Sequence, residues 1–290
     1  MTSSARAAWK AAGGARKKAR PPAPATAVGI VFHVEPRALS AEDVAAYEDS
    51  FLSSLWPRPL RYLVTQAIPG RPIPRPAGTI SLGERSQVLR EVLIHPDLWQ
   101  VSLATSKATV GGYAQLSVCT RPSIDSEDLR TYGRRPLDLS ATGESDGWVK
   151  GMLELADRVG AHHGVVPVMS DPGVLIDISG VNVIADGVPQ HPAPAQLERM
   201  ASVDRELGTR YVRFPRWGTL LSHAHVQALG GRARIEDAVH PAVVEEVGRG
   251  FYFQLTTTLA TAMAQDAQRQ QLAFTELAAP LLPPTRSART

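Results

Sequence analysis

The chain has 290 residues, of which 43% are hydrophobic, and a formal net charge of +3. Six of its 31 basic residues and none of its 28 acidic residues lie in residues 1–26, so the remainder has a net charge of −3. This composition is ordinary for a globular protein. The acidic body argues against a body that binds nucleic acid, because such a body needs cations gathered on one face.

The sequence contains no run close to the ~18 apolar residues of a membrane span. Its basic N-terminus lacks the apolar stretch of about 7–15 residues that a secretory signal needs. Cys119 is the one cysteine, which excludes a disulfide framework or a cysteine-based zinc site within one chain. We therefore expect a cytoplasmic protein with no membrane partner, in which Cys119 is a buried, inert thiol on a strand.

Residues 1–26 are rich in alanine, arginine, lysine and proline. They offer too little apolar surface to offset the entropy lost on ordering. We predict a disordered basic tail that acts as a solubilising extension. A role for this tail at nucleic acid or at a membrane surface is the alternative.

Strands and helices alternate through the first half of the body. Residues 27–34 are rich in β-branched side chains and predict a strand. Ser40 is placed to cap a helix whose apolar face includes Val44, Tyr47 and Phe51. The further predictions are a strand over 60–67, a proline-rich loop over 68–78, a helix over 82–94 and a hairpin of strands 99–105 and 113–119.

The second half follows the same cues. It is predicted to hold a polar loop over 121–135, a strand over 137–141, a helix from 146 to 159, strands around a turn at 170–173, a helix over 197–207, a strand over 251–255 and a closing helix over 274–282. We expect one α+β domain over 27–285, with a mixed, largely antiparallel sheet flanked by helices. Residues 286–290 are a short C-terminal tail.

The stretch 217–231 has the clearest helical pattern of the chain. Its apolar residues recur at the spacing of one helix face: Trp217, Leu220, Leu221, Ala224 and Ala228. Gly230 and Gly231 follow, and glycine ends helices because it takes the left-handed conformation without a Cβ clash. The pattern predicts a buried amphipathic helix on which the body is organised.

Histidine pairs are the first candidates for chemistry. His223 and His225 have a spacing that binds metal on a strand, but on a helix such residues point about 200° apart. His162 and His163 are adjacent at a predicted helix end, where we expect a solvated cap. We predict no metal site and no cofactor.

Nucleotide-binding motifs and zinc-protease motifs are missing from the sequence. We also expect no nucleophile elbow. Paired carboxylates occur at 42–43, 127–128, 236–237 and 245–246, in polar or helix-start contexts where solvated faces are expected rather than a tuned acid and base. The pattern favours a binding protein over an enzyme.

One string of residues indicates a protein family as well as a secondary structure. Trp217-x-x-Leu220-Leu221 running into Ala228-Leu-Gly-Gly231, with the strand–helix unit over 27–56 and the closing segment over 274–282, resembles the TsiV-like type VI immunity family. That family comprises immunity proteins for VRR-NUC toxins. The resemblance implies that Trp217, Leu221, Gly230 and Gly231 are structural residues that fix the fold and do not touch the toxin.

The resemblance implies an immunity protein that neutralises a cognate antibacterial toxin, often a nuclease, delivered by a type VI secretion system. Binding would be stoichiometric and would cover the active site or DNA groove. Because a nuclease presents a cationic groove, we expect acidic contacts: Asp125, Glu127 and Asp128 in one loop, and Glu144 and Asp146 in another.

Two other readings of the sequence remain open. The first is a small hydrolase whose site is assembled from scattered His, Asp and Ser residues. The second is a DNA-associated protein that acts through the basic tail. Under the immunity reading we expect a toxin protein as partner and no direct contact with nucleic acid.

Overall fold

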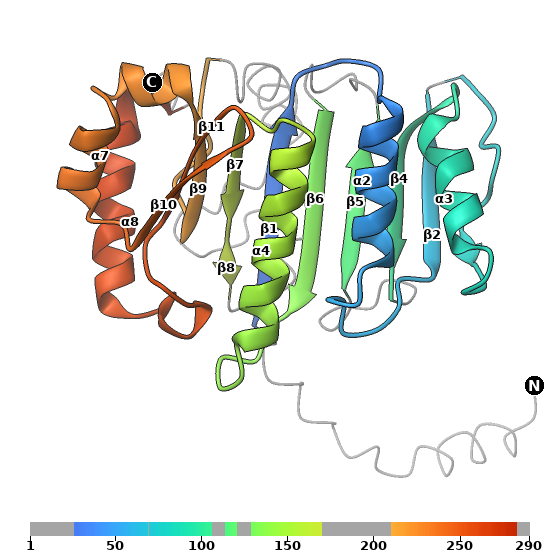
Figure 1. Ribbon diagram of the computed structural model, residues 1–290, viewed down its shortest axis with the longest axis horizontal. Helices are drawn as coiled ribbons and strands as arrows, with labels where there is room; N and C mark the ends of the chain where they lie inside the picture. Colours follow the sequence, from blue (N-terminus) through green and yellow to red (C-terminus); the bar gives the residue numbers. More distant parts are fainter. Residues whose placement is uncertain (1–25, 69, 106–113, 121–128, 170–209, 283–290) are drawn as a thin grey trace, which may run out of the picture.

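The computed structural model describes residues 26–68, 70–105, 114–120, 129–169 and 210–282. Within these residues a single sheet runs through the whole body (Figure 1), and every strand pairing in it is antiparallel. Its strands are β1 (Ala27–Val34), β2 (Tyr62–Ala67), β3 (Gly78–Thr79), β4 (Leu98–Ala104), β5 (Gln115–Cys119), β6 (Leu129–Pro136), β7 (His163–Val166), β8 (Val168–Met169), β9 (Gly218–Ser222), β10 (Val243–Val247) and β11 (Gly250–Gln254). Along the sheet they follow the order β10-β11-β9-β7-β1-β6-β5-β4-β2-β3, and β8 also pairs with β1.

The described helices form two groups. The first group lies across the central and β2 side of the sheet: α2 (Ala41–Leu52), α3 (Arg85–Ile94) and α4 (Gly143–Arg158). The second group gathers at the end formed by β9, β10 and β11: α6 (His223–Ala228), α7 (Arg232–Val239) and α8 (Gln265–Ala278), with the 3₁₀ turns η2 (Leu259–Thr261) and η3 (Ala279–Leu281). The predicted single α+β domain is confirmed. Its limits at 27 and 285 stay a prediction, because residues 1–25 and 283–290 lie outside the described part.

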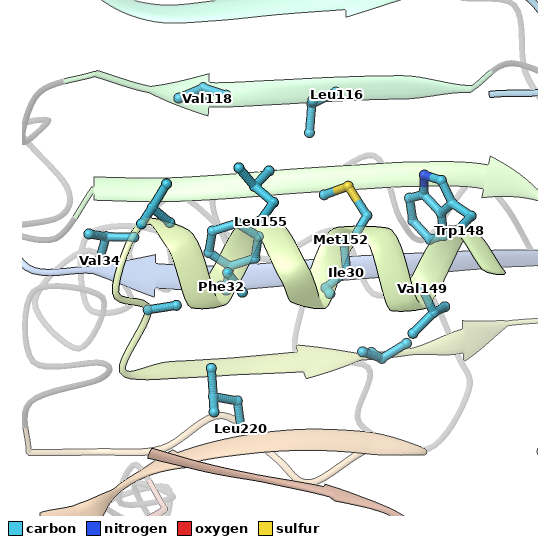
Figure 2. Close-up of a cluster of buried hydrophobic side chains, with 14 of the residues drawn as sticks. Ile30, Phe32, Val34, Leu116, Val118, Trp148, Val149, Met152, Leu155 and Leu220 are labelled. Carbon is cyan, nitrogen blue, oxygen red and sulfur yellow. The ribbon is translucent and has the colours of Figure 1, made fainter. Parts of the chain in front are cut away.

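The main core lies between α4 and the sheet (Figure 2). Alternate residues of β1 face α4, where Ile30 and Phe32 are each at most 2% exposed. Trp148 and Met152 of α4 cover them. Gly133 of β6 pairs with Ile30, and a Cβ at this glycine would come within 2.9 Å of Met152 Cε. The lack of a side chain at Gly133 therefore lets α4 pack closely onto the sheet.

Several predicted elements are confirmed. β1 spans the predicted residues, and Ser40 caps α2: its Oγ accepts from Asp43 N at 3.1 Å, and its own N–H donates to Asp43 Oδ2 at 2.7 Å. This reciprocal capping box satisfies two backbone donors that a helix start leaves open. The predicted hairpin is the pair β4 and β5, and Cys119 on β5 is buried as expected.

The segment predicted as a polar loop over 121–135 contains a central strand. Its described part, 129–135, belongs to β6 (Leu129–Pro136), which pairs along its full length with β1 and also pairs with β5. The predicted strand over 137–141 is wrong. That stretch makes a turn in which Ala141 N donates to Asp138 O at 3.1 Å. The sequence of β6 contains several arginines and lacks the apolar alternation that predicts a strand. It forms a strand because it pairs with a neighbouring strand on each edge.

The predicted helix over 217–231 is wrong in its first half. Residues 218–222 form β9, which is paired on both sides, with β7 and β11. Leu220 and Leu221 are both buried, because each face of this strand is covered, and apolar side chains on both faces imitate a helical spacing. Gly218 is required there, since a Cβ would lie 2.2 Å from the Tyr252 hydroxyl.

The second half of that stretch is the short helix α6. Ser222 caps it by accepting from His225 N at 3.2 Å. Gly230 and Gly231 have φ values of 95° and 93°, so the predicted stop is confirmed. The closing helix α8 begins at Gln265, well before the predicted start at Phe274, and β10 was not predicted.

The two ends of the sheet are both poor templates for another strand. β3 is two residues long and follows Pro72, Pro74 and Pro76. β10 at the other end pairs with β11 and carries the adjacent, exposed Glu245 and Glu246. Short edges, prolines and charges are the features that limit pairing between sheets.

Candidate functional site

The predicted acidic contact residues differ in their surroundings. Asp125, Glu127 and Asp128 lie outside the described residues. Glu144 and Asp146 were assigned to a loop, but the structure places both in the first turn of α4, where acidic side chains suit the positive helix end. The Glu144 side chain is 86% exposed, whereas Asp146 Oδ1 accepts from Leu259 N at 2.8 Å. Glu144 is exposed, but its Oε2 accepts from Arg135 Nη2 at 3.3 Å. Asp146 serves to hold η2 against α4.

Arg135 of β6 lies beneath this helix start and is 4% exposed. Its Nη1 donates to Leu55 O at 2.8 Å and to Glu144 O at 3.1 Å, so it ties the segment after α2 to α4. Burial lowers the pKa of Arg135, which the neighbouring Glu144 carboxylate opposes. Beside it is a hollow of about 590 Å³, whose lining includes Asp138 and Ser145.

Ser145 belongs to a Gly-x-Ser-x-Gly string at 143–147, although no nucleophile elbow was predicted. In a nucleophile elbow the serine stands at a sharp turn between a strand and a helix. Ser145 instead lies within α4, is 3% exposed, and follows a turn rather than a strand. Its N–H donates to Thr142 O at 2.8 Å, as in an ordinary helix start. The string therefore does not form an elbow.

A second polar site lies on the opposite face of β1. His33 of β1, His163 of β7 and His225 of α6 bring their rings together; we call these residues the histidine cluster. The ring centroids of His33 and His163 are 5.4 Å apart, and those of His163 and His225 are 6.0 Å apart. All of these side chains are buried, at 0%, 0% and 4% exposure. They meet because His33 and His163 are direct cross-strand partners.

The hydrogen bonds of His163 fix its protonation. Arg213 N donates to His163 Nε2 at 2.9 Å, so this nitrogen is the acceptor. His163 Nδ1 therefore carries the hydrogen and donates to Leu220 O at 3.0 Å. Burial is the main cause that holds the pKa of His163 well below 6.5, and the neighbouring basic groups His33, His225, Arg213 and His162 lower this pKa further. The ring is neutral, and both of its nitrogens are committed to backbone groups.

Arg213 links His163 to His33. Its side-chain Nε donates to His33 Nε2 at 3.0 Å, while its backbone N–H holds His163. A guanidinium stays charged at any ordinary pH. Arg213 therefore places a permanent positive charge beside two imidazole rings, which favours their neutral forms.

The two histidines of α6 point in different directions. His225 is buried, and its Nδ1 lies 2.9 Å from Ser222 Oγ. His223 has a side chain that is 52% exposed and lies 3.4 Å from Glu246. The helix spacing predicted this divergence. Within the described residues, no group of three or more His, Cys, Asp or Glu side chains is arranged to hold a metal ion.

The prediction for His162 and His163 was wrong. They were expected to be a solvated helix cap, yet they are 6% and 0% exposed. Gly160, at φ 69°, turns the chain after α4, and His162 N then donates to His33 O at 3.0 Å. This bond leads the chain into β7 beside β1, which buries both rings.

The four residues assigned a structural role are buried or shape the backbone after α6. Trp217 is 3% exposed and its Nε1 donates to Thr256 Oγ1 at 2.8 Å, and Leu221 is 0% exposed. Gly230 and Gly231 supply the left-handed backbone after α6. Their lack of contact with a toxin stays a prediction.

The sequence matches no model of a known protein family, and no curated protein matches it. Among the described residues, no helix has both the length and the apolar character needed to cross a bilayer. The structure resembles that of Pseudomonas aeruginosa T6SS protein PA0821, with a TM-score of 0.60 and 12% sequence identity. The match covers 91% of this chain and 77% of that chain. At this identity the likeness establishes that the two proteins have the same fold.

Proposed function

We propose that this chain is an immunity protein associated with type VI secretion, which binds a cognate toxin and neutralises it. The observation that carries the proposal is the shared fold with a T6SS protein over 91% of this chain. The resemblance of the 217–231 string to the TsiV-like immunity family supports the same role from the sequence.

The proposed mechanism is obstruction without chemistry. The toxin is a nuclease of the VRR-NUC type or a related one, and the immunity protein covers its active site or DNA groove. Beyond residue 26 the chain has a net charge of −3, and an acidic partner speeds its encounter with a cationic groove. Both ring nitrogens of His163 form hydrogen bonds to backbone groups, which supports a structural role for the histidine cluster.

A co-expression experiment tests the function. Any nuclease encoded next to this reading frame is expressed as the candidate toxin in a sensitive host, with and without this chain. We expect growth arrest by the toxin alone, rescue by the chain, and a 1:1 complex in size-exclusion chromatography. Arrest that persists at a high level of this chain, with no complex formed, contradicts the proposal.

Charge reversal tests the contact surface. The variant with Asp125, Glu127, Asp128 and Glu144 changed to Lys is expected to associate more slowly with the toxin and to bind at least about tenfold more weakly. Asp146 is left unchanged because it holds Leu259 N.

The control for the Glu144 reversal is Glu154→Lys, an exposed position on the same helix, α4. It is expected to bind the toxin like the wild type. Urea denaturation of both variants separates a folding defect from a binding defect. If the quadruple variant binds with unchanged affinity, this surface is not the contact.

A hydrolase is the second candidate, and one contact favours it. Ser222 Oγ lies 2.9 Å from His225 Nδ1, which is the relation of a nucleophile to its base. The same hydroxyl accepts from His225 N, so an N-cap explains the contact without catalysis. Labelling with a fluorophosphonate that disappears in Ser222→Ala supports the hydrolase; an unlabelled wild type excludes Ser222 as an activated nucleophile.

A further inference from the structure

We infer that the histidine cluster is an acid-sensitive latch, which joins the C-terminal strands to the rest of the sheet while its rings are neutral and releases them when the rings take up protons. This inference is independent of the proposed function. It concerns how the two parts of the sheet stay together.

The histidine cluster contacts both parts of the sheet. In the sheet order, β7 lies between β1 on one side and the set β9, β11 and β10 on the other. His163 sits on β7, contacts the His33 ring on β1, and holds the Leu220 carbonyl of β9. His225 packs against it from α6, which follows β9 directly. The cluster therefore spans the seam between the two parts of the sheet.

The hydrogen bonds at the seam require neutral rings. His163 Nε2 accepts from Arg213 N, and His33 Nε2 accepts from Arg213 Nε. A proton on either of these nitrogens replaces an acceptor with a donor that faces an N–H group, and it breaks the bond. Both bonds are made by Arg213, so protonation detaches the segment that leads into β9.

The electrostatic setting makes protonation of the folded cluster unfavourable. Among the described residues, the groups that lower the pKa of His163 are His33 of β1, His225 of α6, Arg213 in the segment before β9, and His162, its neighbour in sequence. All of them are basic. Protonation therefore adds positive charges at close range in a buried site, where they are costly.

The direction of the pH effect follows from the lowered pKa of His163. The unfolded chain binds a proton at this histidine below about pH 6.5, whereas the folded chain does not. Stability from His163 is present above pH 6.5 and is lost as the pH falls towards its folded pKa. For one such proton, the folding equilibrium constant falls by up to about tenfold per pH unit.

Two substitutions test the latch. His163→Gln and His163→Asn keep an amide that donates and accepts but cannot titrate. We expect their urea midpoints to fall less steeply than the wild type between pH 7.5 and pH 5, by the equivalent of about one proton. The matched control is His223→Gln, because His223 is an exposed histidine of α6 outside the cluster; it should keep the wild-type slope.

Hydrogen exchange in the wild type tests where the opening occurs, and it does not depend on any variant folding. After correction for the intrinsic effect of pH on exchange, the amides that pair β7 with β9 should lose protection on acidification well before those that pair β4 with β5. Equal loss along the whole sheet, or a wild-type pH slope in both His163 variants, overturns the inference.

Discussion

Strand β1 is buried on both faces, but the two faces are covered by different chemistry. Towards α4, Ile30 and Phe32 meet Trp148 and Met152 in a close-packed apolar layer. On the other face, His33 is equally buried but meets another ring and the guanidinium of Arg213. The first face is stabilised by contact area, which does not depend on pH. The second depends on the protonation of its groups, so equal burial on the two faces does not mean equal robustness.

Removing a large side chain from the apolar face should have the largest effect. Phe32→Ala is expected to lower the free energy of unfolding by about 3–5 kcal/mol, because it removes apolar contacts and leaves a cavity. Phe32 is 1% exposed. Urea denaturation at pH 7.5 and pH 5 measures the loss, which should be the same at both values. A cost that changes with pH would show that the two faces are coupled.

Adding a methyl group to the apolar face tests how tightly it is packed. In Gly133→Ala the new Cβ would lie 2.9 Å from Met152 Cε and 3.0 Å from Trp148 Cζ2, so α4 must shift, at a cost of about 1–3 kcal/mol. Gly147→Ala on α4 is the control: its Cβ meets nothing within 4 Å, and it should stabilise the helix by about 0.5–1 kcal/mol. Thermal unfolding compares the two; a Gly133→Ala protein as stable as the wild type contradicts close packing.

A smaller effect is expected on the polar face. Thr219 is 0% exposed, and its Oγ1 accepts from Arg216 N at 3.0 Å. Thr219→Val keeps the shape but loses this bond, which should cost about 0.5–1.5 kcal/mol. Thr219→Ser, which keeps the hydroxyl, separates the bond from the methyl group. If Thr219→Ser is the more destabilised of the two in urea denaturation, packing rather than hydrogen bonding dominates there.

Elements specified by local cues were predictable from the sequence. β1 is rich in β-branched residues, and the Ser40–Asp43 box marks the start of α2. β6 was not predictable in this way, since its polar residues become a strand through pairing with β1 and β5, which are distant in sequence. For β9 the local cue was ambiguous, because a strand covered on both faces has the apolar content of a helix face.

The candidate sites also divide into features that local sequence predicts and features that depend on long-range pairing. The divergence of His223 from His225 follows from helix geometry, whereas Glu144 was assigned to a loop and lies in α4. The histidine cluster could not be predicted, since His33, His163 and His225 come from separate parts of the chain and meet only once the sheet order is known. The one available cue was that His33 falls on a strand otherwise composed of apolar residues and glycine. A polar residue in such a setting needs a partner.

The two ends of the sheet have a consequence for how the protein behaves at high concentration. A two-residue strand behind prolines at one end, and a strand with adjacent glutamates at the other, give a second molecule little backbone on which to extend the sheet. Concentrated solutions should therefore stay free of fibrous, sheet-on-sheet growth near neutral pH.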